Sequence, residues 1–304
     1  MEKKIKGIIA PMVTPLSGPD ELDREGTANL VEHIISGGVH CIFILGSTGE
    51  AQSLSKRLRK EFVELVCSLV GGRVPVLVGI TDTSLRESLE IAELSERCGA
   101  LGVVVAPPYY FPISQVELYE YYTALADSLP LPLYLYNIPS NVKSILEVST
   151  VLRLAEHPNI AGLKDSSANM VYFRTLCHYL GGRDNFALYV GSEELLGECV
   201  LIGADGGVNG GANMFPELYV SMYDAASKED LQSVRRIQER IMTVSRSIYT
   251  VGKYGSSYLK GLKCALSLLG ICPDYMEWPF RKFLPSERVL IRKALMDLGY
   301  KELR

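Results

Sequence analysis

The sequence predicts an α/β protein with the (β/α)8 TIM-barrel fold, followed by a helical extension at its C-terminus. Eight short runs rich in Val, Ile and Leu alternate with amphipathic segments. The runs are continuously apolar, which is typical of parallel strands that are buried on both faces. The 304 residues also suffice for a barrel of about 200–250 residues with additional helices.

The eight predicted strands are bounded by Gly, Pro or polar residues. In chain order they are Gly7–Val13, His40–Gly46, Val74–Ile80, Gly102–Ala106, Leu131–Asn137, Ile160–Lys164, Ala187–Gly191 and Gly206–Asn209. Strands separated by helices pair in parallel through right-handed crossovers. A doubly wound open sheet is the alternative, but it usually has a glycine-rich turn after its first strand. Here Pro11 and Pro15 flank that strand end, which favours the closed barrel.

Helical periodicity fills the segments between the strands. The helices that we expect there include Lys56–Val70 with Ser55 as its N-cap, Ser84–Cys98, Gln115–Ala126, Glu147–Ala155 and Met170–Leu180. From about Lys228 onward strand-like runs stop, and the expected helices are Asp230–Ile248, Ser257–Leu269 and Ser286–Gly299. We therefore predict a barrel catalytic domain at residues 1–227 and a helical extension at residues 228–304.

Composition argues against several functional classes. The formal net charge is −4 and no basic tract follows the chain, so we expect no nucleic-acid partner. No stretch approaches 18 uninterrupted apolar residues, and Met1–Lys6 lacks an apolar signal segment, so we expect a soluble cytoplasmic protein that does not enter membranes. The seven cysteines form no C-x-x-C pair and the four histidines have no metal-ligand spacing, so no metal site is expected.

Lys164 is the most informative residue, because it ends the apolar run Ile160–Leu163 and precedes Asp165-Ser166-Ser167. A buried site favours the neutral amine, which is then a nucleophile toward carbonyl carbon. This pattern predicts Schiff-base chemistry. The alternative is a lysine at a strand end that pairs with a carboxylate such as Asp165.

Barrel enzymes place reactive groups at the carboxyl ends of their strands. Gly46-Ser47-Thr48-Gly49-Glu50 offers hydroxyl and backbone donors for a carboxylate, although Ser47-x-x-Glu50 is also a capping-box pattern. Pro107-Pro108-Tyr109-Tyr110 is either rigid packing or a source of a phenol. Tyr136-Asn137-Ile138-Pro139 places at the barrel mouth a tyrosine that needs a proton relay to act near neutral pH.

Together these motifs resemble the dihydrodipicolinate synthase and N-acetylneuraminate lyase family of pyruvate-dependent class I aldolases. The resemblance rests on the motifs at residues 46–50, 108–110 and 136–139 and on Gly162-Leu163-Lys164-Asp165, which follow one another at similar intervals in that family. It extends over nearly the whole chain. Four ordered motifs are much more specific than any one of them.

The resemblance implies roles for individual residues. Lys164 would form an imine with pyruvate, without a metal or other cofactor, and Tyr136 would be the general acid and base. Thr48 would pass the proton toward Tyr110 of a neighbouring subunit in a homo-oligomer, a dimer of dimers. Further residues are expected to bind substrate: Ser47 and Thr48 with Gly49 at the pyruvate carboxylate, the Val208 carbonyl, Gly191, Glu193, Glu194, Ser166 and Asn141.

The chain also departs from the family pattern. Dihydrodipicolinate synthases generally carry an arginine after the Tyr-Asn-x-Pro motif, where this chain has Ser140-Asn141-Val142. Gly191-Ser192-Glu193-Glu194 resembles a sialic-acid lyase motif whose acids bind substrate hydroxyls, although acids also suit the start of a helix. Gly210 stands where those lyases tend to have a further hydroxyl side chain.

We therefore expect a lyase that cleaves or forms a C–C bond between pyruvate and an aldehyde, with a 2-keto-3-deoxy sugar acid or sialic-acid type substrate. The alternatives are a 4-hydroxy-tetrahydrodipicolinate synthase of lysine biosynthesis and a related sugar-acid dehydratase. A pyruvate- or sugar-acid-binding paralogue without activity is the non-enzyme alternative. A phosphate-binding barrel would rest on the glycines of residues 206–211, which lack a P-loop lysine.

Overall fold

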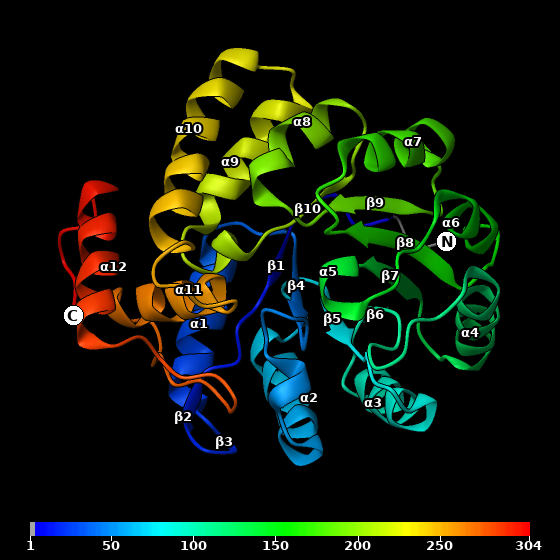
Figure 1. Cartoon of the computed structure of the whole chain (residues 1–304), viewed down its shortest axis with the longest axis horizontal. Helices are drawn as coiled ribbons and strands as arrows, with labels where there is room; N and C mark the ends of the chain where they lie inside the picture. The colour runs from blue at the N-terminus through cyan, green and yellow to red at the C-terminus, as the bar shows by residue number, and fades with distance from the viewer. Residues whose placement is uncertain (1–3) are drawn as a thin grey trace.

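The computed structural model describes residues 4–304 and contains a closed barrel of eight parallel strands (Figure 1). The strands are β1 (Gly7–Pro11), β4 (Cys41–Ile44), β5 (Val76–Gly79), β6 (Gly102–Val105), β7 (Leu133–Asn137), β8 (Ile160–Asp165), β9 (Ala187–Val190) and β10 (Gly206–Val208). Their order around the barrel follows the chain, and β1 closes the sheet by pairing with both β4 and β10. The predicted fold class is confirmed. Residues 1–3, where the predicted barrel domain begins, lie outside the described residues.

Each predicted apolar run contains one of these strands, usually shortened at its ends. The run His40–Gly46, for example, yields β4 over Cys41–Ile44. Strand β8 instead extends one residue beyond its prediction, to Asp165. Strand ends differ because pairing stops where each chain segment leaves the sheet for its loop, and the apolar pattern alone does not fix that point.

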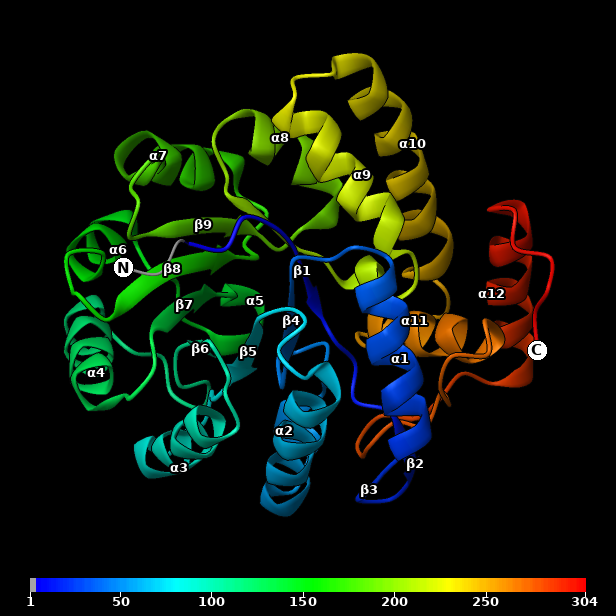
Figure 2. The ribbon, with the colours of Figure 1, turned by 180° about the vertical axis from the view of Figure 1, so that it is seen from behind.

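The helices surround the barrel, as Figures 1 and 2 show from opposite sides. They are α1 (Arg24–Ser36), α2 (Lys56–Val70), α3 (Leu85–Arg97), α4 (Gln115–Ser128), α6 (Val148–Leu154), α7 (Met170–Leu180), α8 (Leu196–Leu201) and α9 (Pro216–Ser227). The Ser55 hydroxyl accepts a hydrogen bond from the Leu58 N–H at 3.1 Å, so the predicted N-cap of α2 is confirmed. The short hairpin of β2 (Leu16–Gly18) and β3 (Glu21–Leu22) was not predicted, because such segments are too brief for periodicity to detect.

Side chains alternate between the inside and the outside of the barrel, as the period of a strand requires. On β4, Ile42 and Ile44 pack outward under the helices, whereas Cys41 and Phe43 face the interior. The interior cluster also contains Ile9, Leu77, Val104, Tyr134, Tyr136, Tyr189 and Val208. Side chains of the described residues therefore fill most of the barrel interior and leave only a small cavity there.

Three further helices follow the barrel: α10 (Leu231–Ile248), α11 (Ser257–Leu268) and α12 (Pro285–Asp297). Helix α10 packs on α9, and α12 lies at the outer edge of the molecule (Figures 1 and 2). Helix α11 returns to the barrel, where it contacts the short helical segment η3 (Gly210–Asn213). The division into folding units at residues 227 and 228 stays a prediction. No helix within residues 4–304 combines the length and apolarity that a membrane span requires.

A fully buried ion pair joins α11 to the loop after β4. The Lys263 amine lies 2.5 Å from the Glu50 carboxylate, and both side chains are 0% exposed. The same amine donates to the Thr14 carbonyl at 3.0 Å, and the second carboxylate oxygen accepts from the Glu277 N–H at 3.2 Å. Removing one partner would leave the other charge buried without compensation, which is strongly destabilising.

We expect Lys263→Met to lower the free energy of unfolding by about 3–5 kcal/mol, because Glu50 then loses its counter-charge in the interior. Urea unfolding followed by circular dichroism measures this change. Lys60→Met is the control, since Lys60 forms a partly exposed pair with Glu90 and should contribute less than about 1 kcal/mol. Equal losses in the two variants would contradict the importance of the buried pair.

Candidate active site

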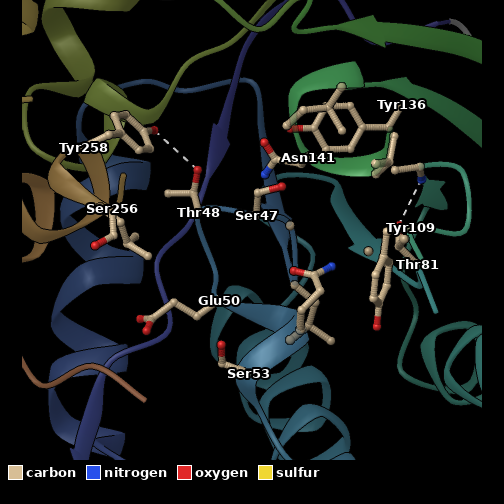
Figure 3. Close-up of a pocket in the computed structure, with 18 of the residues that line it drawn as sticks. Ser47, Thr48, Glu50, Ser53, Thr81, Tyr109, Tyr136, Asn141, Ser256 and Tyr258 are labelled. Carbon is tan, nitrogen blue, oxygen red and sulfur yellow. Dashed lines mark hydrogen bonds between the residues drawn. The ribbon is translucent and has the colours of Figure 1, made fainter. Parts of the chain in front are cut away.

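A pocket of about 370 Å³ opens at the carboxyl ends of the barrel strands. Its walls come from the loops after β4, β5, β6 and β7 and from the first turn of α11. The polar side chains that line it include Ser47, Thr48, Thr81, Tyr109, Tyr136, Asn141, Ser256 and Tyr258 (Figure 3). This is the end of the fold at which barrel enzymes carry their reactive groups.

Strand register brings Lys164 and Tyr136 together. They are paired neighbours on β8 and β7, so their side chains point to the same side of the sheet. The Lys164 amine lies 4.2 Å from the centre of the Tyr136 ring and 5.5 Å from that of Phe43. Both rings also line the pocket, whereas Lys164 itself borders a small cavity inside the barrel. The amine therefore lies at the boundary between the barrel interior and the pocket.

Lys164 is 7% exposed, and among residues 4–304 no ion pair involves it. The carboxylate of Asp165 is used elsewhere: it accepts from the Asn137 side chain at 2.8 Å and from the N–H and hydroxyl of Ser167 at 3.1 and 3.0 Å. Burial raises the pKa of Asp165. Asp165 thus orders the turn after β8, and the alternative of a Lys164–Asp165 pair does not describe this structure.

The loop after β4 presents Ser47 and Thr48 to the pocket. Figure 3 shows the Thr48 hydroxyl turned toward Tyr258, while Ser47 lies on the side of Tyr136 and Asn141. The loop is held by Thr14, whose hydroxyl donates to the Gly49 carbonyl at 2.7 Å. The capping-box alternative is wrong, because Glu50 has a left-handed backbone and its carboxylate is bound to Lys263. The two hydroxyls are therefore free of a helix-capping role.

The structure does not bring Tyr110 to the pocket of its own chain. Its side chain is 68% exposed and packs edge-on against the equally exposed Phe111, with ring centres 4.9 Å apart. Its neighbour Tyr109 lines the pocket instead. The hydroxyl of Thr48 meets Tyr258, 3.3 Å away, and not Tyr110. A relay from Thr48 to Tyr110 is not assembled within one chain.

The two glutamates after β9 also lie apart from the pocket. Glu193 is buried and accepts hydrogen bonds from the Tyr219 hydroxyl, from the Tyr249 hydroxyl at 3.1 Å and from the Gly211 N–H at 3.2 Å. The Glu194 carboxylate accepts from the Ser245 hydroxyl at 2.5 Å. Both acids begin a short helical segment, η2 (Glu193–Leu195), so here the structure favours the helix-start interpretation over substrate binding.

The other predicted binding residues lie in three places. Asn141, on the short helix α5 (Pro139–Val142), lines the pocket. Val208 borders the interior cavity beside Lys164. Ser166 and Gly191 lie against each other near the ends of β8 and β9 and do not line the pocket. Among residues 4–304, no group of three or more His, Cys, Asp or Glu side chains is arranged to hold a metal ion.

Sequence reasoning missed Tyr258, Thr81 and Tyr109 as pocket residues. Tyr258 carries no local signal, because it lies in the first turn of a helix that the pattern assigns to the extension. Only the path of α11 back to the barrel brings it to the pocket. Tyr109 stands next to the predicted Tyr110, and side-chain direction in an irregular loop does not follow a sequence period.

Comparisons with known proteins agree with this geometry. The sequence pattern of the Dihydrodipicolinate synthetase family matches residues 4–296. A structure of dihydrodipicolinate synthase from Bacteroides thetaiotaomicron superposes with a TM-score of 0.95 and 55% identity, covering 98% of this chain and 100% of that one.

Two further relatives differ in the activity that their names state. The putative 2-dehydro-3-deoxy-D-gluconate aldolase YagE of Escherichia coli K12 is 32% identical over 78% of this chain and 80% of its own. Its structure in complex with pyruvate superposes with a TM-score of 0.90 at 29% identity, covering 96% of this chain and 98% of that one. The 4-hydroxy-tetrahydrodipicolinate synthase of Kosmotoga olearia is 29% identical over 97% of this chain and 98% of its own.

The buried carboxyl of Glu193 should make stability depend on pH. Burial raises its pKa to about 7, against 4.5 for an ordinary glutamate. The native state then holds a proton that the unfolded chain has lost, so the free energy of unfolding falls as pH rises from about 4.5 to about 7. At about 1.4 kcal/mol per pKa unit, the decrease is at most about 3.5 kcal/mol.

We expect Glu193→Gln to abolish this part of the pH dependence, because the amide does not titrate. Urea unfolding of both proteins at pH 5 and pH 8 measures the difference between the slopes. Glu194→Gln serves as the comparison and should keep most of the wild-type slope, since Glu193 remains, although the pKa of Glu193 should fall because the nearby charge of Glu194 helps to raise it. Parallel pH profiles of the wild type and the Glu193→Gln variant would rule out titration of this buried group.

Proposed function

The chain belongs to the dihydrodipicolinate synthetase family, a family of lyases, and from this premise we propose that it joins pyruvate to an aldehyde, or cleaves their product, through an imine on Lys164. The observation that carries the proposal is the buried Lys164 amine, which forms no ion pair within residues 4–304 and lies beside the ring of Tyr136, a residue that lines the pocket. A positioned amine of this kind is a nucleophile for a keto carbon.

The proposed reaction balances with the chain's own groups. The Lys164 amine adds to C2 of pyruvate, and the Tyr136 phenol protonates the hydroxyl that leaves as water, which gives a protonated imine and the Tyr136 phenolate. The phenolate takes a proton from C3, which gives an enamine, and C3 of the enamine attacks the aldehyde carbon. The aldehyde oxygen receives a proton from Tyr136, and water then releases the product from Lys164. Cleavage follows the same steps in reverse, with Tyr136 as the base.

Ser47 and Thr48 are the proposed binding groups for the pyruvate carboxylate. Both line the pocket from the loop after β4, where backbone N–H groups and hydroxyls are available. Gly49 follows them and does not line the pocket; a Cβ atom at this position would lie 3.2 Å from the Met12 carbonyl oxygen, so glycine allows the loop to pack closely against the chain after β1. Fixing the carboxylate holds C2 over the amine. Positioning of this kind lowers the activation barrier by several kcal/mol, as it does in intramolecular reactions.

The pocket favours an uncharged, hydroxylated aldehyde. No Arg or Lys is among the residues that line it within the described chain, and the charge of Glu50 is neutralised by Lys263. Asn141, Thr81 and Tyr258 offer neutral hydrogen-bonding groups. A second carboxylate would lack the bidentate cation that recognises it best. We therefore propose a 2-keto-3-deoxy sugar acid or sialic-acid type substrate, in keeping with the activity that YagE's name states.

A 4-hydroxy-tetrahydrodipicolinate synthase is the second candidate function. The names of the Kosmotoga olearia relative and of the Bacteroides thetaiotaomicron structure favour it. A sugar-acid dehydratase would form the same imine but would break a C–O bond of the substrate where an aldolase breaks a C–C bond. A panel of sialic acid, 2-keto-3-deoxygluconate, 4-hydroxy-2-oxoglutarate and aspartate semialdehyde separates these activities by the products formed.

We also propose that Tyr110 completes the site of a neighbouring subunit in a homo-oligomer, a dimer of dimers. Its phenol is exposed and lies outside its own pocket, together with Phe111, which is 70% exposed. An exposed pair of aromatic side chains suits an interface between copies, since aromatic residues are enriched there.

Incubation with pyruvate and borohydride should add one reduced pyruvyl group to Lys164, located by mass spectrometry of peptides. Lys164→Ala should lose both the adduct and the turnover. Tyr136→Phe is the matched control: it should keep the adduct, because the amine remains, and lose at least about 100-fold in turnover, because general acid–base catalysis typically contributes about 10²–10⁴-fold. A wild-type protein without an adduct would disprove the imine mechanism, and an adduct without turnover on the panel would favour the non-catalytic paralogue.

Subunit mixing tests the role of Tyr110. Co-expressed Lys164→Ala and Tyr110→Phe chains should form hybrids in which one site has an intact Lys164 and receives an intact Tyr110 from its neighbour. Activity should then exceed that of either variant alone and approach half of the wild-type value per hybrid dimer. If Tyr110 acts within its own chain, no hybrid site is complete and mixing restores nothing.

A further inference from the structure

We propose that Tyr258 is a specificity-determining residue, whose phenol hydrogen-bonds a hydroxyl group of the aldehyde portion of the substrate. The inference rests on the proposed function and adds to it a residue from outside the barrel. Tyr258 lies in the first turn of α11, and its side chain enters the pocket opposite Tyr136 (Figure 3). Its oxygen is 3.3 Å from the Thr48 hydroxyl.

Counting hydrogen bonds shows that this pair of hydroxyls has capacity to spare. Tyr258 and Thr48 carry two O–H protons, and the bond between them uses one. Within residues 4–304 neither hydroxyl has another hydrogen-bonding partner. With the Thr48 O–H directed to the pyruvate carboxylate, the Tyr258 hydroxyl still has its own O–H, which can donate to Thr48 or to the substrate, and lone pairs that can accept from a substrate hydroxyl. A substrate hydroxyl, which both donates and accepts, matches that set, whereas an apolar group would leave it unsatisfied.

The phenol fits in this place because residue 210 is a glycine. A Cβ atom at position 210 would overlap the Tyr258 oxygen. Gly210 begins η3, directly beyond the end of β10. The Tyr258 hydroxyl thus occupies the space that a side chain at the mouth of β10 would otherwise fill. Two residues far apart in the sequence together create a hydroxyl-bearing wall.

A buried hydrogen-bonded group holds the Tyr258 ring from behind. The ring packs edge-on against Tyr249, with centres 4.7 Å apart and planes at 67°. The Tyr249 hydroxyl donates to Glu193, which also accepts from the Gly211 N–H next to Gly210. Glu193 therefore holds in place both Tyr249, which packs against the Tyr258 ring, and the Gly210-Gly211 turn, which leaves space for the Tyr258 hydroxyl. A side chain restrained in this way can discriminate between ligands by a single hydrogen bond.

The test compares two three-carbon aldehydes, glyceraldehyde and propanal, as partners of pyruvate. Tyr258→Phe should lower kcat/KM for glyceraldehyde at least about tenfold and change that for propanal less than about twofold, because only the former has hydroxyls to bind. Borohydride trapping on Lys164 and exchange of the pyruvate methyl protons with D2O should stay near wild-type values. Gly210→Ala, which displaces the phenol, should give the same loss of selectivity.

Tyr179→Phe is the matched control, since it removes a phenol hydroxyl from an exposed side chain of α7 that does not line the pocket. It should leave kcat/KM for both aldehydes near the wild-type values. If Tyr258→Phe lowered kcat/KM for both aldehydes by the same factor, the inference would be overturned and the imine mechanism would remain intact. A wild type that exchanges pyruvate protons but condenses with neither aldehyde, or prefers propanal, would overturn it as well. Absence of trapping and of exchange in the wild type would disprove the proposed function itself.

Discussion

Closure of the parallel sheet is the constraint on which the rest of this structure depends. Eight strands that run in one direction bring all their carboxyl ends to one mouth, and the filled interior excludes a ligand from any deeper position. The register of β7 and β8 then sets Tyr136 beside Lys164 without any further contact. The proximity of the proposed catalytic pair is thus a consequence of strand pairing, and the loops complete the pocket beside it.

The C-terminal extension belongs to the site as much as the barrel does. Helix α11 reaches the loop after β4 at two points, through Tyr258 at Thr48 and through Lys263 at Glu50. These contacts fall on either side of Gly49, so the segment proposed to bind the pyruvate carboxylate is restrained from outside the barrel. A loop held in this way loses little entropy when ligand binds, which is the usual advantage of a preorganised site.

Charge distribution distinguishes the two ends of the pocket. The amine of Lys164 lies at the barrel side of the pocket, beside Tyr136, whereas the polar side chains that line the pocket are hydroxyls, amides and the carboxylate of Glu50, which is paired with Lys263. Two acids that the sequence suggested as ligands for a polyol, Glu193 and Glu194, are instead bound to Tyr219, Tyr249 and Ser245. Substrate hydroxyls would therefore be bound by uncharged side chains of the pocket, and Glu193 would contribute by holding these side chains in place.

The sequence by itself determined the barrel and indicated Lys164 as the candidate nucleophile. Apolar runs mark buried strands, and an ammonium at the end of one is too costly to occur without a function or a partner. The sequence could not predict where the side chains of Tyr258, Glu193 and Tyr110 lie relative to the pocket. The direction of a loop side chain and the return of α11 to β10 depend on contacts between distant segments, such as the fit of the Tyr258 oxygen to Gly210. Local patterns record which residues are buried, whereas only tertiary packing decides which of them meet.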